Sequence, residues 1–215
     1  MTRIYSSAFH TSYQYSLAYC FPDITWTFDG WWSDNRPMLP NVKVSRTDEF
    51  YDFDLYLAHS PLQYSQLACE LEAHGVPRER IIYISHWAYQ KSLWQHTYDG
   101  VGLDVFLKDV SQSAIVCVSH FMTDQFGFYS DVCVQTIPQF VPPHLFDVAA
   151  WVPGNQTYIN VVNNFYLPYR GVGARFWASI DFVPKELYGT GNKETDAGPL
   201  NTIEDYKNAV SKAAA

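Results

Sequence analysis

The sequence predicts an α/β protein built on a Rossmann-like parallel β-sheet flanked by helices. Short runs of β-branched and aromatic residues alternate with helical segments along the 215 residues, as in successive βαβ units. The runs at 81–85 and 114–118 are apolar at nearly every position, as expected of strands buried on both faces. Residues 114–137 give strand, helix and strand in direct succession.

The elements of the first domain follow in order. Strands are predicted over 3–7, 24–28, 42–44, 54–59, 81–85, 114–119 and 132–137. Helices are predicted over 12–20, 61–74, part of 94–109 and from about 120. Pro61 suits the first turn of the second helix and Gly75 its end. We expect its apolar side to consist of Leu62, Leu67, Cys69 and Leu71.

A second, shorter α/β unit follows the turn signal at 154–155. Strands are predicted over 158–162 and 184–188, and helices over 174–180 and 203–212, the last with Thr202 as N-cap. We therefore expect domains at 1–150 and 151–215. The second would be an incomplete Rossmann-like domain, since a full one needs on the order of a hundred more residues. Phe176 and Trp177 would then be exposed and would mediate self-association or partner binding.

Composition narrows the class of protein. The net charge of −8 argues against a duplex-DNA or anionic-membrane binder, because phosphate neutralisation needs Lys and Arg. No signal peptide and no apolar run of about 18 residues is visible, so we expect no transmembrane span. The four cysteines form no C-x-x-C pair, which indicates buried free thiols in a cytoplasmic protein.

Candidate site residues follow from the rule that open parallel sheets bind ligands beyond the carboxyl ends of their strands. His10, His59, His86 and Ser119 each follow a predicted strand. Histidine at such a position can donate a hydrogen bond or transfer a proton. Each one alone is equally explained as a hydrogen-bonded loop residue. The histidine spacing and the lack of nearby carboxylates favour no metal.

Glycines near two predicted element ends suggest a phosphate site. Arg170 and Gly171 precede the helix at 174–180, and Gly189 and Gly191 follow the strand at 184–188. A cation, glycines and helix N-terminal amides suit a phosphate, although an ordinary helix start or tight turn explains the same residues. The sequence has no P-loop, G-x-G-x-x-G or G-x-S-x-G motif, and we expect no cofactor.

Five short motifs occur in order and resemble a known family. They are IIYISH at 81–86, AIVCVSHFM at 114–122, VQTIPQFV at 134–141, INVV with YRG within 159–171, and LYGTG at 187–191. Their order and spacing are similar to those of GT-B fold glycosyltransferases, most like the retaining family-4 group. The resemblance extends from about residue 50 to 192.

The resemblance implies two Rossmann-like domains with a nucleotide-sugar between them. It assigns His86 to the donor sugar as the catalytic histidine, and Arg170 to the diphosphate. The other donor-binding residues would be Asn164, Gly171, Gly189 and Gly191. An acceptor, which the sequence does not identify, would lie near His10, His59 and Ser119.

The sequence departs from the family pattern at several places. Ser6 and Ser7 stand where glycines usually follow the first strand, and Asn163 and Asn164 stand where an arginine is common. The chain also stops before the acidic motif that normally holds the donor ribose and sugar. The alternative to an enzyme is therefore a non-catalytic, glycosyltransferase-like module that binds a partner or a glycan.

Overall fold

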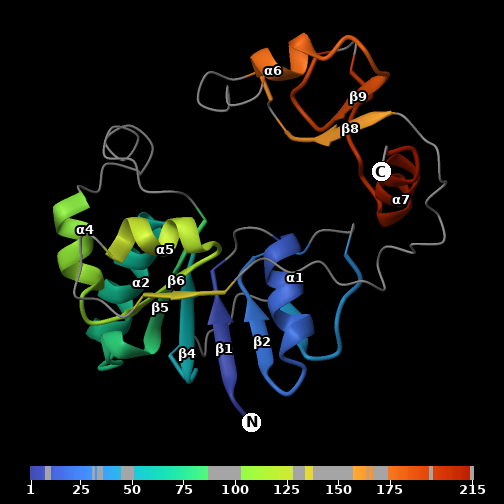
Figure 1. Ribbon diagram of the computed structural model, residues 1–215. Coiled ribbons are helices and arrows are strands. Elements are labelled where there is room, and N and C mark those ends of the chain that lie inside the picture. The colour runs from blue at the N-terminus through green and yellow to red at the C-terminus, as the bar shows by residue number, and fades with distance from the viewer. Residues whose placement is uncertain are drawn as a thin grey trace. The chain divides into compact units, whose positions relative to one another are not determined.

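The structure is a computed structural model in which contacts divide the chain into two units (Figure 1). One unit comprises residues 1–33 and 37–141, and the other residues 34–36 and 142–215. The structure describes residues 1–7, 11–30, 32, 36–44, 51–86, 103–127, 134–137, 157–163, 165–166, 174–193 and 196–213. The predicted domain boundary at residue 150 lies outside these ranges.

The first unit is built on a seven-stranded, entirely parallel sheet. Its strands are β1 (Arg3–Ser6), β2 (Thr25–Phe28), β3 (Val42–Val44), β4 (Leu55–Ala58), β5 (Ile81–Ser85), β6 (Ala114–Cys117) and β7 (Val134–Thr136). Their spatial order is β3-β2-β1-β4-β5-β6-β7. The predicted α/β class and Rossmann-like sheet are confirmed, and the two apolar runs at 81–85 and 114–118 form interior strands.

Helices connect the strands of this sheet. They are α1 (Thr11–Cys20), α2 (Pro61–Ala73), α4 (Leu103–Val110) and α5 (His120–Gly127), with a 3₁₀ turn η1 (Arg78–Arg80) before β5. Ser60 caps α2 by accepting the Gln63 N–H, and Gly75 ends it with φ of 73°. Both helix ends agree with the signals in the sequence, because proline fits the first turn and glycine adopts positive φ without strain.

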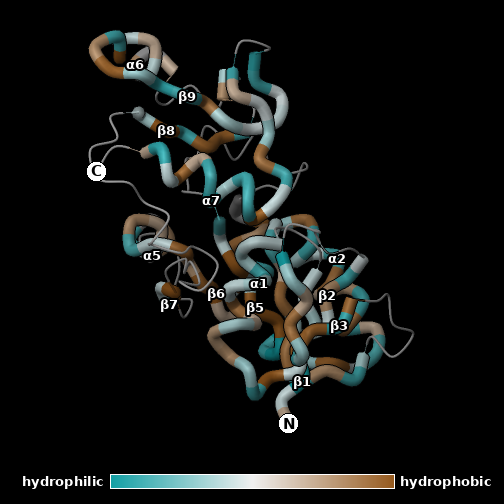
Figure 2. The backbone as a smooth tube through the Cα atoms, turned by 90° about the vertical axis from the view of Figure 1, so that its right-hand side faces the viewer, coloured by the Kyte–Doolittle hydropathy of each residue, from teal (hydrophilic) through white to brown (hydrophobic). Residues whose placement is uncertain are grey.

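Two apolar clusters cover the two faces of the sheet. One contains side chains of α2, α4 and α5, together with alternate strand residues such as Tyr5 and Tyr83. The other contains side chains of α1 and the intervening strand residues, such as Ile4, Leu57 and Ile84. Figure 2 shows the hydrophobic residues gathered on the strands of this unit. Burial on both faces explains why the strands read as nearly continuous apolar runs.

The apolar face of α2 differs from the one predicted. The buried positions are Pro61, Tyr64, Leu67, Ala68 and Leu71. The spacing of three and four residues follows the helical period. Tyr64 lies on the buried stripe, although it was not among the residues predicted for the apolar side. Cys69 is exposed, so its assignment to the apolar side was wrong. Cys20 is also exposed and only Cys117 is buried among the described cysteines, which corrects the expectation of buried thiols.

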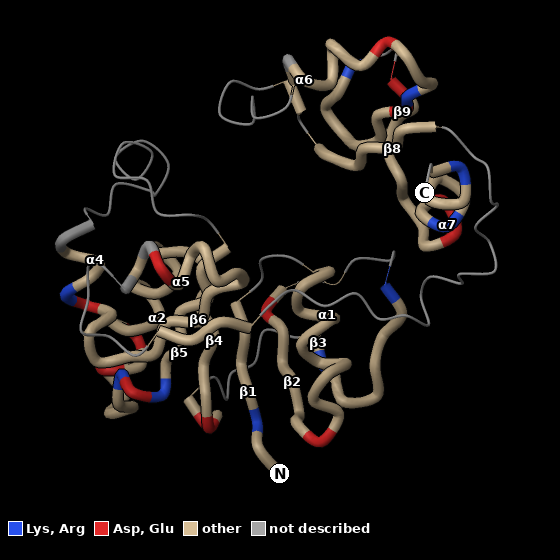
Figure 3. Tube along the Cα trace, viewed as in Figure 1, with Lys and Arg blue, Asp and Glu red and all other residues tan. Residues whose placement is uncertain are grey.

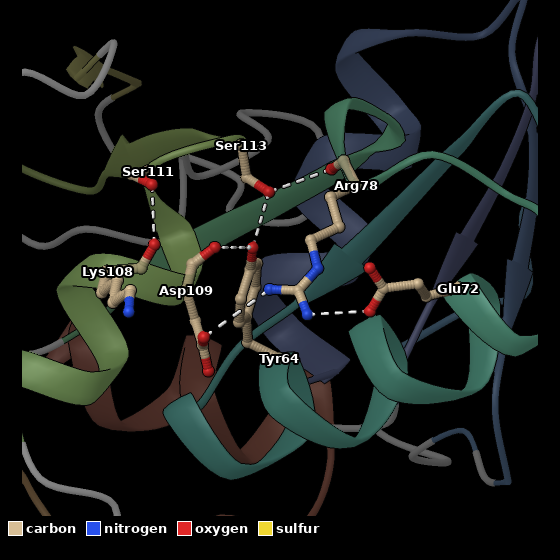
Figure 4. A network of polar contacts seen from close by, with 7 residues as sticks. All are labelled: Tyr64, Glu72, Arg78, Lys108, Asp109, Ser111 and Ser113. Carbon is tan, nitrogen blue, oxygen red and sulfur yellow. Dashed lines mark hydrogen bonds and ion pairs between the residues drawn. The ribbon is translucent and has the colours of Figure 1, made fainter.

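A polar network ties α2, η1 and α4 to the start of β6 (Figure 4). The Tyr64 hydroxyl lies 2.9 Å from the carbonyl oxygen of Asp109 and 2.7 Å from Ser113 Oγ. The Arg78 guanidinium contacts Glu72 at 2.9 Å and Asp109 at 3.6 Å. The network satisfies the hydroxyl of a fully buried tyrosine, which would otherwise lose its hydrogen bonds to water.

The second unit contains a two-stranded parallel sheet. Strands β8 (Tyr158–Val161) and β9 (Lys185–Tyr188) are joined through α6 (Ala174–Ser179), and α7 (Ile203–Ser211) follows. Thr202 and Asp205 form a reciprocal capping box at the start of α7, which confirms the predicted N-cap. Trp177 packs with Phe165, Ile180 and Leu187, so its predicted exposure was wrong.

Phe176 is 65 % exposed, as predicted. Adjacent helical residues point about 100° apart, which allows Phe176 to face solvent while Trp177 packs inward. In the part of the chain that the structure describes, no helix has the length and apolarity needed to cross a bilayer.

Candidate functional site

The carboxyl edge of the first sheet contains a topological switch point between β1 and β4, where the strand order reverses. Helix α1 leaves β1 toward one face, because Tyr13, Leu17 and Ala18 pack in the cluster on that side. Helix α2 leaves β4 toward the other face. In open α/β sheets this is the place where ligands bind.

Polar side chains from three adjacent strand ends form a continuous chain of hydrogen bonds across this point. Ser6 Oγ lies 2.8 Å from His59 Nε2, and His59 Nδ1 lies 2.9 Å from His86 Nε2. Gln14 of α1 donates from Nε2 to Ser6 Oγ at 3.0 Å. We call Gln14, Ser6, His59 and His86 the serine–histidine chain.

Strand geometry explains why these side chains meet. Side chains two residues apart on a strand point to the same face. Ser6 lies two residues after Ile4, and His86 lies two residues after Ile84. Ile4 and Ile84 both belong to the apolar cluster that contains the side chains of α1. His59 follows Leu57 of the same cluster in the same way. All three polar groups therefore emerge on the α1 side at the end of their strands.

The serine–histidine chain is buried, and further hydrogen bonds hold its members in place. Ser6, Gln14 and His59 are at most 2 % exposed, and His86 is partly buried. The backbone N–H of His59 donates to Gln63 Oε1 at 2.9 Å. A second bond from Gln14 Nε2 to the carbonyl oxygen of Ser7, at 3.0 Å, fixes the amide. Burial in low dielectric makes such a network energetically important when it is fully satisfied.

Tyr13 packs against the two histidines. Its ring meets His86 edge-on at a centroid distance of 4.8 Å and His59 at 6.3 Å. Its hydroxyl is buried and has no hydrogen-bond partner among the residues that the structure describes. Burial, with a smaller effect of nearby Cys117, raises the pKa of Tyr13 to about 12. Within the part of the chain that the structure describes, Tyr13 therefore holds a neutral, unsatisfied hydroxyl beside the serine–histidine chain.

The carboxyl edge of the first sheet has fewer charged residues than the amino edge among the residues that the structure describes (Figure 3). Serines and histidines supply most of the polar groups here, with Asp29 as an acidic residue at the end of β2. In Figure 3 the charged residues of this unit lie mainly at the amino ends of the strands and on the outer helices. Arg3 and Asp52, for example, pair there at 2.6 Å. The described part of the carboxyl edge therefore favours a neutral hydrogen-bonding group over a charged one.

The structure brings two of the predicted residues of this edge into contact and gives a third a structural role. His59 and His86 are in direct contact. Ser119 instead supports the start of α5, because its Oγ accepts the backbone N–H of Met122 at 3.4 Å and its carbonyl oxygen accepts that of Thr123. His10 lies outside the described residues, as do Asn164, Arg170 and Gly171.

The predicted glycine turn of the second unit has a structural cause. Gly189 has φ of 137°, and a Cβ placed on it would lie 2.4 Å from the carbonyl oxygen of Val162. Gly191 has φ of 72°. Asn163 Oδ1 accepts the N–H of Thr190 at 2.9 Å, which ties the ends of β8 and β9 together. Close backbone approach and positive φ therefore account for these glycines without a ligand.

A pocket of about 630 Å³ lies on the second unit beside this turn. It is lined by three aromatic rings, three lysines, two acidic residues and four other residues: Tyr166, Trp177, Tyr188, Lys185, Lys193, Lys212, Glu186, Asp196, Ala174, Ala178, Leu187 and Ala197. Its volume is in the range of small-molecule sites.

The lysines of this pocket differ in their partners. Lys212 pairs with Glu186 at 3.2 Å, and Lys185 donates to the carbonyl oxygen of Trp177 at 2.6 Å. The Lys193 ammonium lies 4.2 Å from the centre of the Tyr166 ring, a cation–π contact. A hydrogen bond from Tyr188 lowers the pKa of Glu186, and Lys212 adds a smaller effect in the same direction. Lys193 is thus the lysine best placed to meet an anionic, aromatic ligand.

Sequence reasoning missed Ser6, Gln14, Tyr13 and the pocket of the second unit. The strand-end rule that selected His59 applies equally to Ser6, which ends β1. Gln14 and Tyr13 gave no signal, because α1 is buried over most of its length and lacks a clear polar face. No protein-family model matches the chain, and no curated protein matches it closely enough to count as a relative.

Proposed function

We propose that this protein binds a nucleotide-sugar and transfers its sugar to an acceptor, as GT-B glycosyltransferases do. The observation that carries the proposal is the pocket of the second unit. It runs along β9 of a parallel βαβ unit and combines aromatic rings with lysines. Of its lining residues, Tyr166 and Lys193 follow the carboxyl ends of β8 and β9, where such units bind ligands. Rings suit a nucleobase, and an ammonium suits a phosphate.

The first unit supplies the groups for the sugar in this proposal. His86 would contact the donor sugar, and the acceptor would lie near His10, His59 and Ser119. The fully buried His59 holds the ring of His86 through the 2.9 Å contact, and a fixed ring is what positioning of a substrate requires. No metal is assigned, and leaving-group charge would be stabilised by side chains and amides.

The second unit supplies the groups for the nucleotide. Lys193 and Tyr166 would contact the nucleoside diphosphate within the pocket, and Arg170 would face the diphosphate. Gly171 and Asn164 belong to the same proposed set, as do Gly189 and Gly191. For the two glycines of the β9 turn, the structural cause given above is a competing explanation.

A binding experiment tests the proposal. Uridine, guanosine and adenosine diphosphates and their sugars are titrated calorimetrically into the protein. A charge-assisted contact contributes roughly 1.5–3 kcal/mol, so Arg170→Ala and Lys193→Gln should each weaken nucleotide binding about ten- to a hundredfold. The matched control is Lys43→Gln, which removes the same charge from an exposed position on β3. His86→Ala should lower turnover more than nucleotide affinity.

The result also separates the two candidate functions. Absence of nucleotide binding in folded wild-type protein contradicts sugar transfer and favours a non-catalytic binding module. The observation that supports this second candidate is the exposure of Phe176 at 65 % and Phe182 at 80 %, which suits a homo-oligomer or a complementing partner. Light scattering of the same samples would then show whether copies of the chain associate.

A further inference from the structure

The serine–histidine chain fixes more than the position of His86, because the direction of each hydrogen bond constrains the next. Both ring nitrogens of His59 are engaged, one by Ser6 and the other by His86. A neutral imidazole has one N–H donor and one acceptor nitrogen. The bond to Ser6 therefore determines which way the bond to His86 runs.

Gln14 sets the starting direction. The carbonyl oxygen of Ser7 can only accept, so the Gln14 atom that lies 3.0 Å from it must be the Nε2 donor. The same nitrogen lies 3.0 Å from Ser6 Oγ and cannot accept from it. Ser6 Oγ thus accepts from Gln14, and its own proton remains to be donated.

Distance selects the acceptor of the Ser6 proton. His59 Nε2 lies at 2.8 Å and the carbonyl oxygen of Ser7 at 3.3 Å. Bonds from a hydroxyl to an oxygen are 2.5–3.0 Å long, so the 3.3 Å contact with Ser7 is weak and His59 Nε2 accepts the proton. His59 is then protonated at Nδ1 and donates to His86 Nε2. His86 in turn carries its proton on Nδ1.

We infer that Ser6, oriented by Gln14 and acting through His59, is a positioning residue that makes His86 a neutral hydrogen-bond donor at Nδ1. The identity of the atom that receives this bond rests on the proposed function, in which it is an oxygen of the donor sugar. The tautomer itself follows from the contacts alone. His86 in this state cannot accept a proton at Nδ1, so it does not act there as a general base.

The environment of the histidines supports the neutral state. Tyr13 packs against both rings from α1 as a neutral phenol. Protonating both imidazoles would place two N–H groups face to face across 2.9 Å, and neither nitrogen could then accept a hydrogen bond from the other. The pair therefore holds at most one added proton.

Nitrogen NMR of the histidine side chains reads the tautomers directly. We expect His59 and His86 to show protonated Nδ1 and unprotonated Nε2, with their signals assigned from the spectra of His59→Gln and His86→Gln. Neutral histidine in water prefers the Nε2-protonated form, so Ser6→Ala should switch both rings to it. Ser6→Thr keeps the hydroxyl and should retain the wild-type pattern. Ser119→Ala, at another strand end, is the matched control and should leave both rings unchanged.

Two results overturn the inference. One is a wild-type spectrum with His59 protonated at Nε2, which needs no variant and so holds even if Ser6→Ala does not fold. The other is a folded Ser6→Ala protein in which both tautomers remain as in wild type.

A binding comparison separates the inference from the proposed function. Ser6→Ala should weaken a nucleotide-sugar about two- to tenfold, the value of one neutral hydrogen bond, and leave the nucleoside diphosphate unchanged. Ser6→Thr should restore the affinity. If the tautomers are as expected but no nucleotide binds, the inferred tautomer is supported and sugar transfer is contradicted. If nucleotide-sugar binds but the tautomers are the opposite ones, sugar transfer is supported and the inferred tautomer is contradicted.

Discussion

Replacing Tyr13 with Phe should stabilise the protein, whereas the same replacement at Tyr64 should destabilise it. Both side chains are at most 5 % exposed, and each substitution removes one hydroxyl oxygen. The Tyr13 hydroxyl has no partner among the described residues, but that of Tyr64 contacts Asp109 and Ser113 (Figure 4). The two variants therefore differ mainly in the hydrogen bonds that are lost.

The magnitudes follow from the cost of burying a hydroxyl. A buried polar group without a partner costs about 1–3 kcal/mol, so Tyr13→Phe should raise the free energy of unfolding by about 1 kcal/mol. For a chain of this size that corresponds to a midpoint increase of about 2–4 °C. Tyr64→Phe breaks satisfied bonds and should lower the free energy of unfolding by about 1–2 kcal/mol.

The gap between wild type and Tyr13→Phe should widen at alkaline pH. The pKa of Tyr13 is raised from 10.0 to about 12 in the folded state. As the pH rises, the unfolded protein therefore releases this proton before the folded protein does. Wild type should lose stability relative to Tyr13→Phe between about pH 10 and 12. The full slope is about 1.4 kcal/mol for each pH unit, but the unfolded tyrosine is only half deprotonated at pH 10. The advantage of Tyr13→Phe should therefore grow by about 1 kcal/mol between pH 10 and 11.

The assay is urea unfolding of wild type and both variants, with hydrogen exchange of β4 and β5 amides to show that the transition belongs to the first unit. If Tyr13→Phe lost about 1 kcal/mol or more, the hydroxyl would have a hydrogen-bond partner such as ordered water, and the predicted stabilisation would be wrong. A stabilised Tyr13→Phe with weaker nucleotide-sugar binding would show that the hydroxyl is retained for a ligand despite its cost.

Two further predictions concern backbone geometry and thiol chemistry. Gly189→Ala should destabilise the second unit by about 3 kcal/mol or more, because its Cβ would meet the carbonyl oxygen of Val162; hydrogen exchange of β9 amides measures the loss. Gly198→Ala, where φ is 85° but the space is open, should cost only about 1 kcal/mol, and equal losses would contradict the steric explanation. In folded protein a thiol reagent followed by mass spectrometry should label exposed Cys69 rapidly. Cys117 should react only on unfolding, because it is inaccessible and burial raises its pKa to about 11; similar labelling rates would refute this.

Much of the fold was predictable because local patterns determine it. All seven strands of the first sheet form at the predicted runs, within one or two residues of the predicted ends. The signals at Pro61, Gly75 and Thr202 mark real helix ends, because each acts through its own backbone or a neighbouring N–H. Cys69 was assigned wrongly, because its apolar character suggested burial although its position on the helix faces solvent.

The candidate site was predictable only in part. His59 and His86 were found because they end strands, and the strand-end rule needs no knowledge of strand order. The role of Gly189 was not predictable, since it depends on a contact with the backbone of Val162, which follows another strand. Ser119 caps α5 through a local N–H, as Thr202 caps α7, but the strand-end rule assigned it to the ligand edge instead. Trp177 was expected at the surface, but the packing of α6 against β9 buries it.

The α/β class, the strands, the helix limits and the polar residues at the strand ends could all be predicted from the amino-acid sequence, because they follow from periodicities of two and 3.6 residues and from local capping. The position of β1 beside β4 became known only from the three-dimensional fold. That neighbourhood brings Ser6 to His59 across 53 residues of sequence, and His59 to His86 across 27. Hydrogen bonds over such separations depend on strand order, which local periodicity does not encode, so the serine–histidine chain appears only once the sheet is assembled.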